Sequence, residues 1–142
     1  MRLDYRHELP AASRAMGQLE RVVDASTLDP RLRELIKLRA SQINGCAYCV
    51  DMHTKDAEAM GEDLQRIHLV AAWREAPVFS PRERAALAWT EALTLLPQSG
   101  APDDVYAEVA REFDPPEHVP PPLARVPIHG VNRRAVGPRH PV

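Results

Sequence analysis

The feature that most constrains the fold is a series of helix start and stop signals that enclose apolar residues at helical spacing. Asp29-Pro30 is a strong start, because aspartate caps free N–H groups and proline suits the first helical position. Asn44-Gly45 is a strong stop, since both residues tolerate the left-handed conformation at a helix C-terminus. The segment between them predicts an amphipathic helix, with its apolar stripe formed by Leu32, Leu35, Ile36, Leu38 and Ile43.

The same kinds of signal recur along the chain up to about Phe113. The residues from Ser80 to Glu83 form a capping box with proline in its first turn, and they open the clearest helix. No strand alternation of convincing length occurs, so the predicted class is all-α, a single-domain helical bundle. Helices are expected at about residues 11–25, 30–43, 46–60, 63–74, 80–96 and 102–113.

The C-terminal segment has a different composition. Eight of the fourteen prolines lie in the last 28 residues. Proline inside a helix removes a hydrogen bond and clashes with the preceding turn, so the proline triplet at 120–122 and Pro127 predict an extended or irregular arm. A short helix is expected only near 130–136. The chain is therefore interpreted as one domain (1–142), with a helical core at about 15–113 and an irregular Pro-rich tail over 114–142.

Composition argues against several classes of protein. Of the 142 residues, 44% are hydrophobic and 27% are charged, and the net charge of −2 favours neither nucleic acid nor an acidic membrane surface. No apolar run approaches the roughly 20 residues of a membrane helix. The charged N-terminus is not followed by the apolar segment of a signal peptide. We therefore expect a cytoplasmic protein that binds neither nucleic acid nor a membrane.

Chemistry explains the two cysteines of the chain, Cys46 and Cys49, better than stability does. A disulfide between residues so close in sequence closes a very small loop and restrains little unfolded chain. A pair of inert buried thiols is disfavoured by this spacing at a helix start. A structural zinc site is disfavoured as well, because zinc takes four ligands there and only one histidine lies nearby. The pair is interpreted as a redox-active dithiol.

The position of the pair predicts how its sulfurs react. Asn44-Gly45 places Cys46 at a helix start, where unpaired N–H groups and the helix dipole favour a thiolate, and by this reasoning Cys46 is the better-solvated sulfur. Cys49 lies one turn on. His53 follows four residues later, so its imidazole can reach the Cys49 sulfur and exchange a proton with it. Cys49 and His53 therefore have the spacing of a nucleophile and its base.

Glu34 and Tyr48 are further candidates for the site. Glu34 lies beside the apolar stripe of the preceding helix, and a carboxylate on a partly buried face needs a partner. It could orient His53 or relay a proton, or it could be a surface carboxylate paired with Lys37 or Arg39. Tyr48 lies inside the cysteine motif, where it could line a pocket, donate a hydrogen bond to a substrate or simply pack.

The segment from Glu34 to His53 resembles the alkylhydroperoxidase D-like group of the carboxymuconolactone decarboxylase family. It contains the run RASQINGCAYCVDMH over residues 39–53. The specific part is the combination of a glutamate, a step of twelve residues, C-x-x-C and a histidine four residues further on. The resemblance covers roughly residues 15–113.

This resemblance implies an all-helical protein that assembles as dimers, trimers or hexamers. We expect neither a cofactor nor a metal. It implies that Cys49 is the peroxidatic thiol, that Cys46 is the resolving thiol, and that Glu34 and His53 form a proton relay. The expected reaction reduces a hydroperoxide to an alcohol with a thiol reductant, or exchanges disulfides with a redox partner protein. Tyr48 stands where the best-known peroxidases of the group have a second histidine, so it bears on peroxidase rate and substrate.

Three functions are therefore compared. The first is a thiol-dependent peroxidase or disulfide reductase. The second is a redox-sensing oligomeric stress protein that does not turn over peroxide efficiently. The third is a lactone decarboxylase, the other chemistry named in the family. That reaction needs no dithiol, so the C-x-x-C motif disfavours it.

Overall fold

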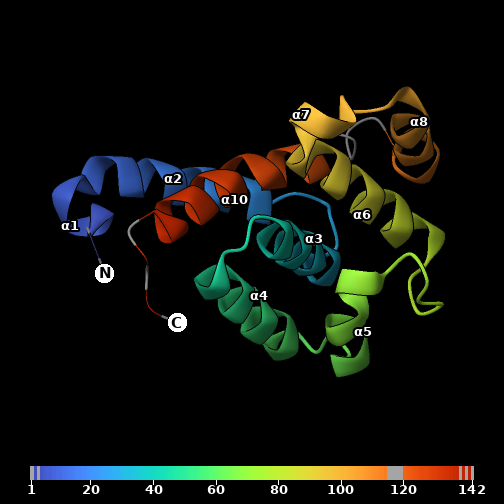
Figure 1. The fold of residues 1–142 in the computed structure, drawn as a ribbon, viewed down its shortest axis with the longest axis horizontal. Helices are drawn as coiled ribbons and strands as arrows, with labels where there is room; N and C mark the ends of the chain where they lie inside the picture. Colours follow the sequence, from blue (N-terminus) through green and yellow to red (C-terminus); the bar gives the residue numbers. More distant parts are fainter. Residues whose placement is uncertain (1, 3, 115–119, 138, 140, 142) are drawn as a thin grey trace.

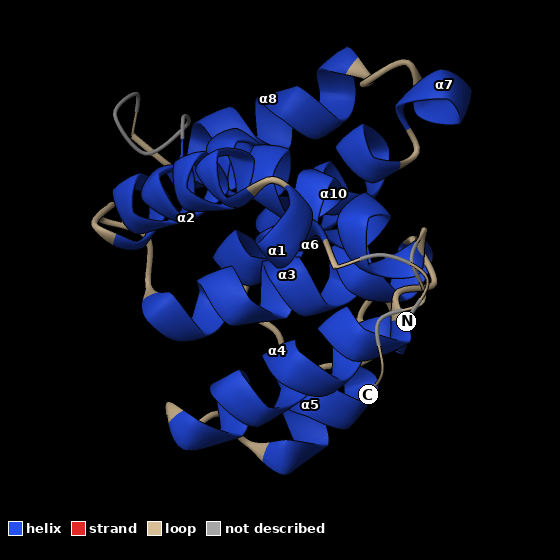
Figure 2. Ribbon diagram, turned by 90° about the vertical axis from the view of Figure 1, so that its left-hand side faces the viewer, coloured by secondary structure: helices blue, strands red, loops and turns tan. Residues whose placement is uncertain are grey.

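The computed structural model describes residues 2, 4–114, 120–137, 139 and 141. The regular elements of these residues are helices (Figure 2), so the predicted all-α class is confirmed. No helix of this part of the chain is both long enough and apolar enough for a membrane span. In chain order the elements are α1 (Tyr5–Glu8), α2 (Pro10–Asp24), α3 (Pro30–Ile43), α4 (Ala47–Ala59), α5 (Leu64–Leu69), the 3₁₀ helix η1 (Val70–Ala72), α6 (Pro81–Thr94), α7 (Leu96–Ser99), α8 (Asp103–Glu112) and α10 (Pro120–Val136).

The helix boundaries follow the sequence signals closely. The side chain of Asp29 caps α3 by accepting hydrogen bonds from two backbone N–H groups. Ser80 and Glu83 form the expected capping box of α6. Gly45 has a φ of +66°, which is the left-handed conformation predicted for the stop after α3. The helix expected over 63–74 divides into α5 and η1.

Helix α3 is the centre of the fold and contacts α4, α6 and α10 (Figure 1). Nine of its fourteen residues are buried. Leu32 and Ile36 belong to an apolar cluster shared with α6 and α8. Leu35 and Leu38 belong to a second cluster shared with α4, α5, η1 and α6. Because partners surround α3, some of its charged residues are buried as well: Arg33, Glu34 and Lys37.

Residues 120–136 form a helix, α10, so the prediction of an irregular arm is wrong for them. The rest of that prediction, over 115–119, 138, 140 and 142, lies outside the described residues. α10 lies alongside α2 and contacts α3, α4 and α6 (Figure 1). The proline triplet at 120–122 occupies its first turn, where a missing N–H breaks no helical hydrogen bond. Pro127 lies inside the helix, a position that costs roughly 3 kcal/mol.

Burial of one face of α10 offsets the cost of Pro127. Ile128, Asn132 and Ala135 have helical spacing and are 1%, 1% and 6% exposed. Gly130 faces the flexible end of the Met16 side chain on α2, since a Cβ atom there would lie 2.7 Å from its Cε. The predicted core at about 15–113 is therefore too short, since α10 contributes buried side chains to the centre of the fold.

Candidate active site

The two cysteines lie at the N-terminus of α4. Cys46 is the N-cap, with an extended backbone (φ −91°, ψ 93°), and its Sγ accepts a hydrogen bond from the N–H of Cys49 at 3.3 Å. The two Cα atoms are 5.3 Å apart, within the range that a disulfide allows. The two sulfurs are bonded, so the structure represents the oxidised pair.

Both cysteines are buried, with 1% of Cys46 and none of Cys49 exposed. They form an apolar cluster with Ala135 of α10, and Tyr48 and Val131 pack against it. The expectation that Cys46 is well solvated is wrong, because α10 covers the start of α4. An apolar environment disfavours the charged thiolate, so ionisation of the reduced pair needs a base close by.

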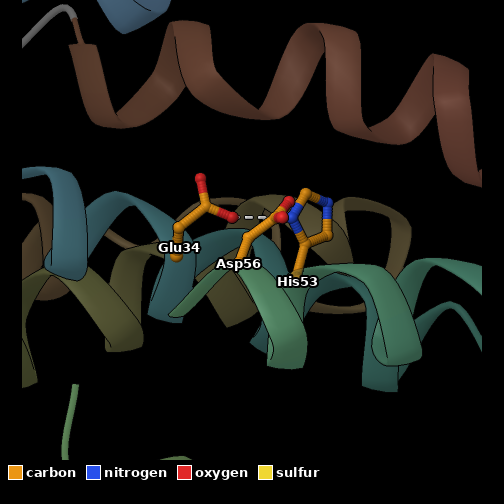
Figure 3. Close-up of side chains that lie close together, drawn as sticks. All are labelled: Glu34, His53 and Asp56. Carbon is orange, nitrogen blue, oxygen red and sulfur yellow. Dashed lines mark hydrogen bonds and ion pairs between the residues drawn. The ribbon is translucent and has the colours of Figure 1, made fainter. Parts of the chain in front are cut away.

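His53 lies on the turn of α4 after Cys49, and Glu34 approaches it from α3 (Figure 3). The distance from Nδ1 of His53 to Oε2 of Glu34 is 2.7 Å, and each side chain is 5% exposed. The other ring nitrogen, Nε2, is buried and has no hydrogen-bond partner among the described residues. The fold therefore brings these two candidate residues together and leaves one imidazole nitrogen available.

Glu34 is held in its ionised form. Burial alone would raise the pKa of this carboxyl, but the hydrogen bond with His53 and the positive charge of Lys37 outweigh burial, so the pKa lies below its ordinary value of 4.5. An ionised carboxylate can only accept a hydrogen bond, so the proton of a neutral His53 ring is on Nδ1. The lone pair is then on Nε2, and His53 can act as a base on the side away from Glu34.

Lys37 connects Glu34 to α2. Its Nζ lies 3.6 Å from Oε1 of Glu34, 3.0 Å from Oε2 of Glu20 and 3.6 Å from Oδ1 of Asp24. Burial would lower the pKa of this ammonium, but the neighbouring carboxylates raise it above its ordinary value of 10.5. Sequence reasoning considered Lys37 only as a surface partner of Glu34. Its side chain is 6% exposed, and residues of a separate helix, α2, supply its other partners.

Arg39, the alternative partner considered for Glu34, lies elsewhere. Its Nε binds Oε1 of Glu91 on α6 at 2.8 Å, and Nε1 of Trp73 donates to the same oxygen at 2.9 Å. This arrangement connects α3 to α6. The partners of Glu34 are therefore His53 and Lys37.

Asp56 completes an acidic cluster around His53 and was not found from the sequence (Figure 3). Potential ligand atoms of Glu34, His53 and Asp56 lie within 4.8 Å of one another, so these residues could hold a divalent cation. The ammonium of Lys37 already lies against Glu34, and its positive charge opposes a second cation. The available signal for Asp56 was its position three residues after His53 on one helix.

Hydrogen bonds also connect α10 to the start of α4. Nδ2 of Asn132 donates to Oγ of Ser41 at 3.0 Å, and the carbonyl of Ser41 accepts the N–H of Cys46 at 3.0 Å. The side chains of Asn44 and His129 are hydrogen-bonded at 3.0 Å. No local pattern could reveal these contacts, because 91 residues separate Ser41 from Asn132.

Comparison with known proteins identifies a family and several relatives. The model of the carboxymuconolactone decarboxylase family matches residues 8–92. The uncharacterized protein YdfG of Bacillus subtilis is 42% identical over 118 residues, which cover 83% of this chain and 80% of YdfG.

Solved structures share the fold. ATU0492 of Agrobacterium tumefaciens, a protein of unknown function proposed to be the antioxidant defence protein AhpD, is 45% identical with a TM-score of 0.95, and the match covers 99% of this chain and 98% of that one. The debrominase Bmp8 has a TM-score of 0.88 at 20% identity, over 96% of this chain and 73% of Bmp8. At that identity the similarity shows the fold alone.

Proposed function

This chain belongs to the carboxymuconolactone decarboxylase family, in its alkylhydroperoxidase D-like group, and on that premise we propose that it reduces hydroperoxides with the dithiol of Cys46 and Cys49. One observation carries the proposal. The buried Nε2 of His53, on the turn after Cys49, has no hydrogen-bond partner in the described part of the chain, while Nδ1 binds an ionised Glu34. A base held in this way can take the proton of a buried thiol that would otherwise stay neutral.

The first half of the reaction oxidises Cys49. Nε2 of His53 takes the thiol proton, and the thiolate attacks the terminal oxygen of the hydroperoxide. The O–O bond breaks, its electron pair leaves with the alkoxide, and the His53 imidazolium returns the proton to give the alcohol. Cys49 becomes a sulfenic acid, and Glu34 stabilises the imidazolium while it exists.

The second half forms the disulfide. The sulfur of Cys46 attacks the sulfur of the Cys49 sulfenic acid, and the hydroxyl leaves as water with the proton of the Cys46 thiol. An external thiol reductant or a redox partner protein then restores the dithiol by thiol–disulfide exchange. In sum, one hydroperoxide and two thiols give one alcohol, one water and one disulfide.

The environments of the sulfurs support this division of roles. Cys49 is one turn from the available nitrogen of His53. Cys46 is instead the helix N-cap, and its sulfur accepts the N–H of Cys49. Positive helix ends stabilise a thiolate, which suits a resolving nucleophile and a leaving group in the later exchange.

A peroxide turnover assay with thiol titration tests the proposal. The reduced wild type should lose two thiols for each hydroperoxide consumed and should turn over when a dithiol reductant is supplied. The Cys46→Ser variant should oxidise Cys49 once without forming the intramolecular disulfide. Cys49→Ser should not react. The proposal fails if both thiols of the wild type stay reduced after addition of peroxide.

Burial of both sulfurs favours a second candidate function, a redox sensor whose pair oxidises once and is not turned over efficiently. Stoichiometric oxidation without further cycles, in the presence of excess dithiol, would support that function. A lactone decarboxylase makes no use of the dithiol, and its activity would survive replacement of both cysteines by serine.

The proposal extends to Tyr48 and to assembly. Tyr48 packs beside the sulfurs, where its ring can border the path of the substrate. A Tyr48→His variant should change the rate of peroxide reduction if this position contributes to proton transfer. Assembly into a homo-oligomer and a cytoplasmic location stay predictions, and sedimentation velocity measures the first of them.

A further inference from the structure

A surface hollow lies between α2 and α10, with a volume of about 610 Å³. We refer to it as the α2–α10 hollow. Its lining is mainly apolar and includes Met16, Gly17 and Val131. Roughly 300–1,000 Å³ is usual for sites that bind small organic molecules, so the hollow has sufficient size for one.

The candidate active site has two parts, the cysteine pair and the charged side chains around His53. Each part has a neighbouring residue that lines this hollow. Val131 lines it and also packs against the cluster of the two cysteines. Glu20 lines it as well, and binds the ammonium of Lys37, which lies against Glu34. A molecule in the α2–α10 hollow would therefore be separated from the sulfurs by Val131 and would lie beside the charges that support His53.

The polar part of the hollow is positively charged. Arg14, Arg21 and Arg134 line it, whereas its acidic residue, Glu20, is already paired with Lys37. Arg14 and Arg21 are exposed and form no ion pair with any described residue. Arg134 donates a hydrogen bond to Oγ of Ser13 on α2, at 3.2 Å.

A second hollow of the molecule lacks this property. It has a volume of about 530 Å³ and contains Arg66, but that guanidinium is bound by the carboxylates of Glu62 and Glu83. The charge of Arg66 is therefore neutralised within the protein. In the α2–α10 hollow, by contrast, Arg14 and Arg21 stay available to an anionic ligand.

We propose that the α2–α10 hollow binds hydroperoxides that carry a carboxylate on an apolar chain. The apolar chain would lie against Met16 and Val131, and the carboxylate would bind Arg14 or Arg21 through charge-assisted hydrogen bonds. This inference rests on the proposed peroxidase function and names the substrate class for it. Entry of the peroxide to Cys49 then requires displacement of Val131, the side chain between the hollow and the sulfurs.

A comparison of matched substrates tests the charge recognition. We expect the wild type to show a kcat/KM about tenfold higher for linoleic acid hydroperoxide than for its methyl ester, because only the acid can form the charge-assisted contact. A tenfold ratio corresponds to about 1.4 kcal/mol. The double variant R14Q/R21Q should reduce this ratio to about one and leave kcat/KM for cumene hydroperoxide unchanged. The control R31Q/R111Q removes two exposed arginines whose ion pairs are 3.9 Å long, and it should keep the ratio.

A binding measurement separates this inference from the peroxidase proposal. Calorimetry with decanoate and decanol on the Cys49→Ser protein needs no turnover. Decanoate should bind more tightly than decanol, and R14Q/R21Q should weaken decanoate binding about tenfold. Reduction of cumene hydroperoxide without discrimination between acid and ester overturns the inference alone. Arginine-dependent binding of decanoate without reduction of any hydroperoxide overturns the peroxidase function alone. Equal affinity for decanoate and decanol also overturns the inference.

Discussion

The first two turns of α4 place their reactive groups in contrasting surroundings. Cys46 and Cys49, on the first turn, belong to an apolar cluster that α10 covers. His53, on the next turn, contacts a series of charged side chains that passes from Glu34 through Lys37 to α2. The sulfurs and the imidazole are neighbours on one helix. Apolar side chains shield the sulfurs from water, whereas a charged hydrogen bond with Glu34 holds the imidazole.

This contrast shows how the apolar half, around the cysteines, and the charged half, around His53, depend on each other. An apolar cover excludes water from the sulfurs but disfavours the thiolate that must attack. In the proposed reaction the charged side chains hold the base that restores the thiolate. Their buried charges are tolerated because each has a partner. Variants that remove one half at a time measure this dependence.

The largest effect is expected from Glu34→Gln. A glutamine amide can donate to Nδ1 of His53, which would move the ring proton to Nε2 and remove the base. We expect the rate of peroxide reduction to fall by about a thousandfold, within the range of general base catalysis. Stopped-flow measurement of thiol oxidation checks this.

A matched control for that variant is Glu91→Gln. Glu91 is also a partly buried carboxylate whose pKa is lowered, by hydrogen bonds from Arg74, Trp73 and Arg39 that outweigh burial. It lies in α6 and makes no contact with His53 in this network. We expect lower stability and an unchanged rate of thiol oxidation. Equal rates for Glu34→Gln and the wild type would contradict the role of His53.

The apolar half is tested by Ile128→Ala. Ile128 is 1% exposed on the buried face of α10, so its truncation should lower the free energy of unfolding by about 3 kcal/mol. Looser packing of α10 should also speed alkylation of the reduced cysteines by iodoacetamide. The control Val136→Ala changes a side chain of the same helix that is 47% exposed and should have little effect on either measurement. Unchanged alkylation in the destabilised variant would show that α10 does not protect the sulfurs.

Lys37→Met separates the effect of charge from that of packing beside the proposed relay of Glu34 and His53. Without the ammonium, the pKa of Glu34 should rise, because a neighbouring positive charge contributes to lowering it. The acid limb of the pH–rate profile should then move to higher pH, and each unit of movement lowers the rate on that limb about tenfold. Lys37→Arg should restore the wild-type profile. A profile that does not move in Lys37→Met would contradict the electrostatic role.

The smallest effect concerns stability at the extremes of pH. The pKa of Glu34 is lowered in the folded protein, so its contribution is present above its ordinary value of 4.5 and is lost as the pH falls through the folded value. The pKa of Lys37 is raised, so its contribution is present below 10.5 and is lost as the pH rises through the folded value. Urea unfolding at a series of pH values should give a flatter stability profile for Glu34→Gln/Lys37→Met than for the wild type.

Much of the local structure was predictable because its causes are local. Asp29, Gly45 and Ser80 end or begin helices through interactions with residues close in sequence. The spacing of Cys46, Cys49 and His53 along one helix was equally readable. The prediction from Pro127 was wrong because intrinsic helix propensity is a weak guide when a buried face stabilises the helix.

By itself, the sequence determined the all-α class, the position of Cys46 at the start of α4 and the candidate site residues on the first two turns of that helix. Only the tertiary structure decided that Cys46 is buried, that Lys37 binds Glu34 beneath α2, and that the α2–α10 hollow exists. Each of these depends on α10 or α2, which contact the site from distant parts of the chain. Helix caps act over a few residues, whereas burial and ion pairing depend on which helices pack together.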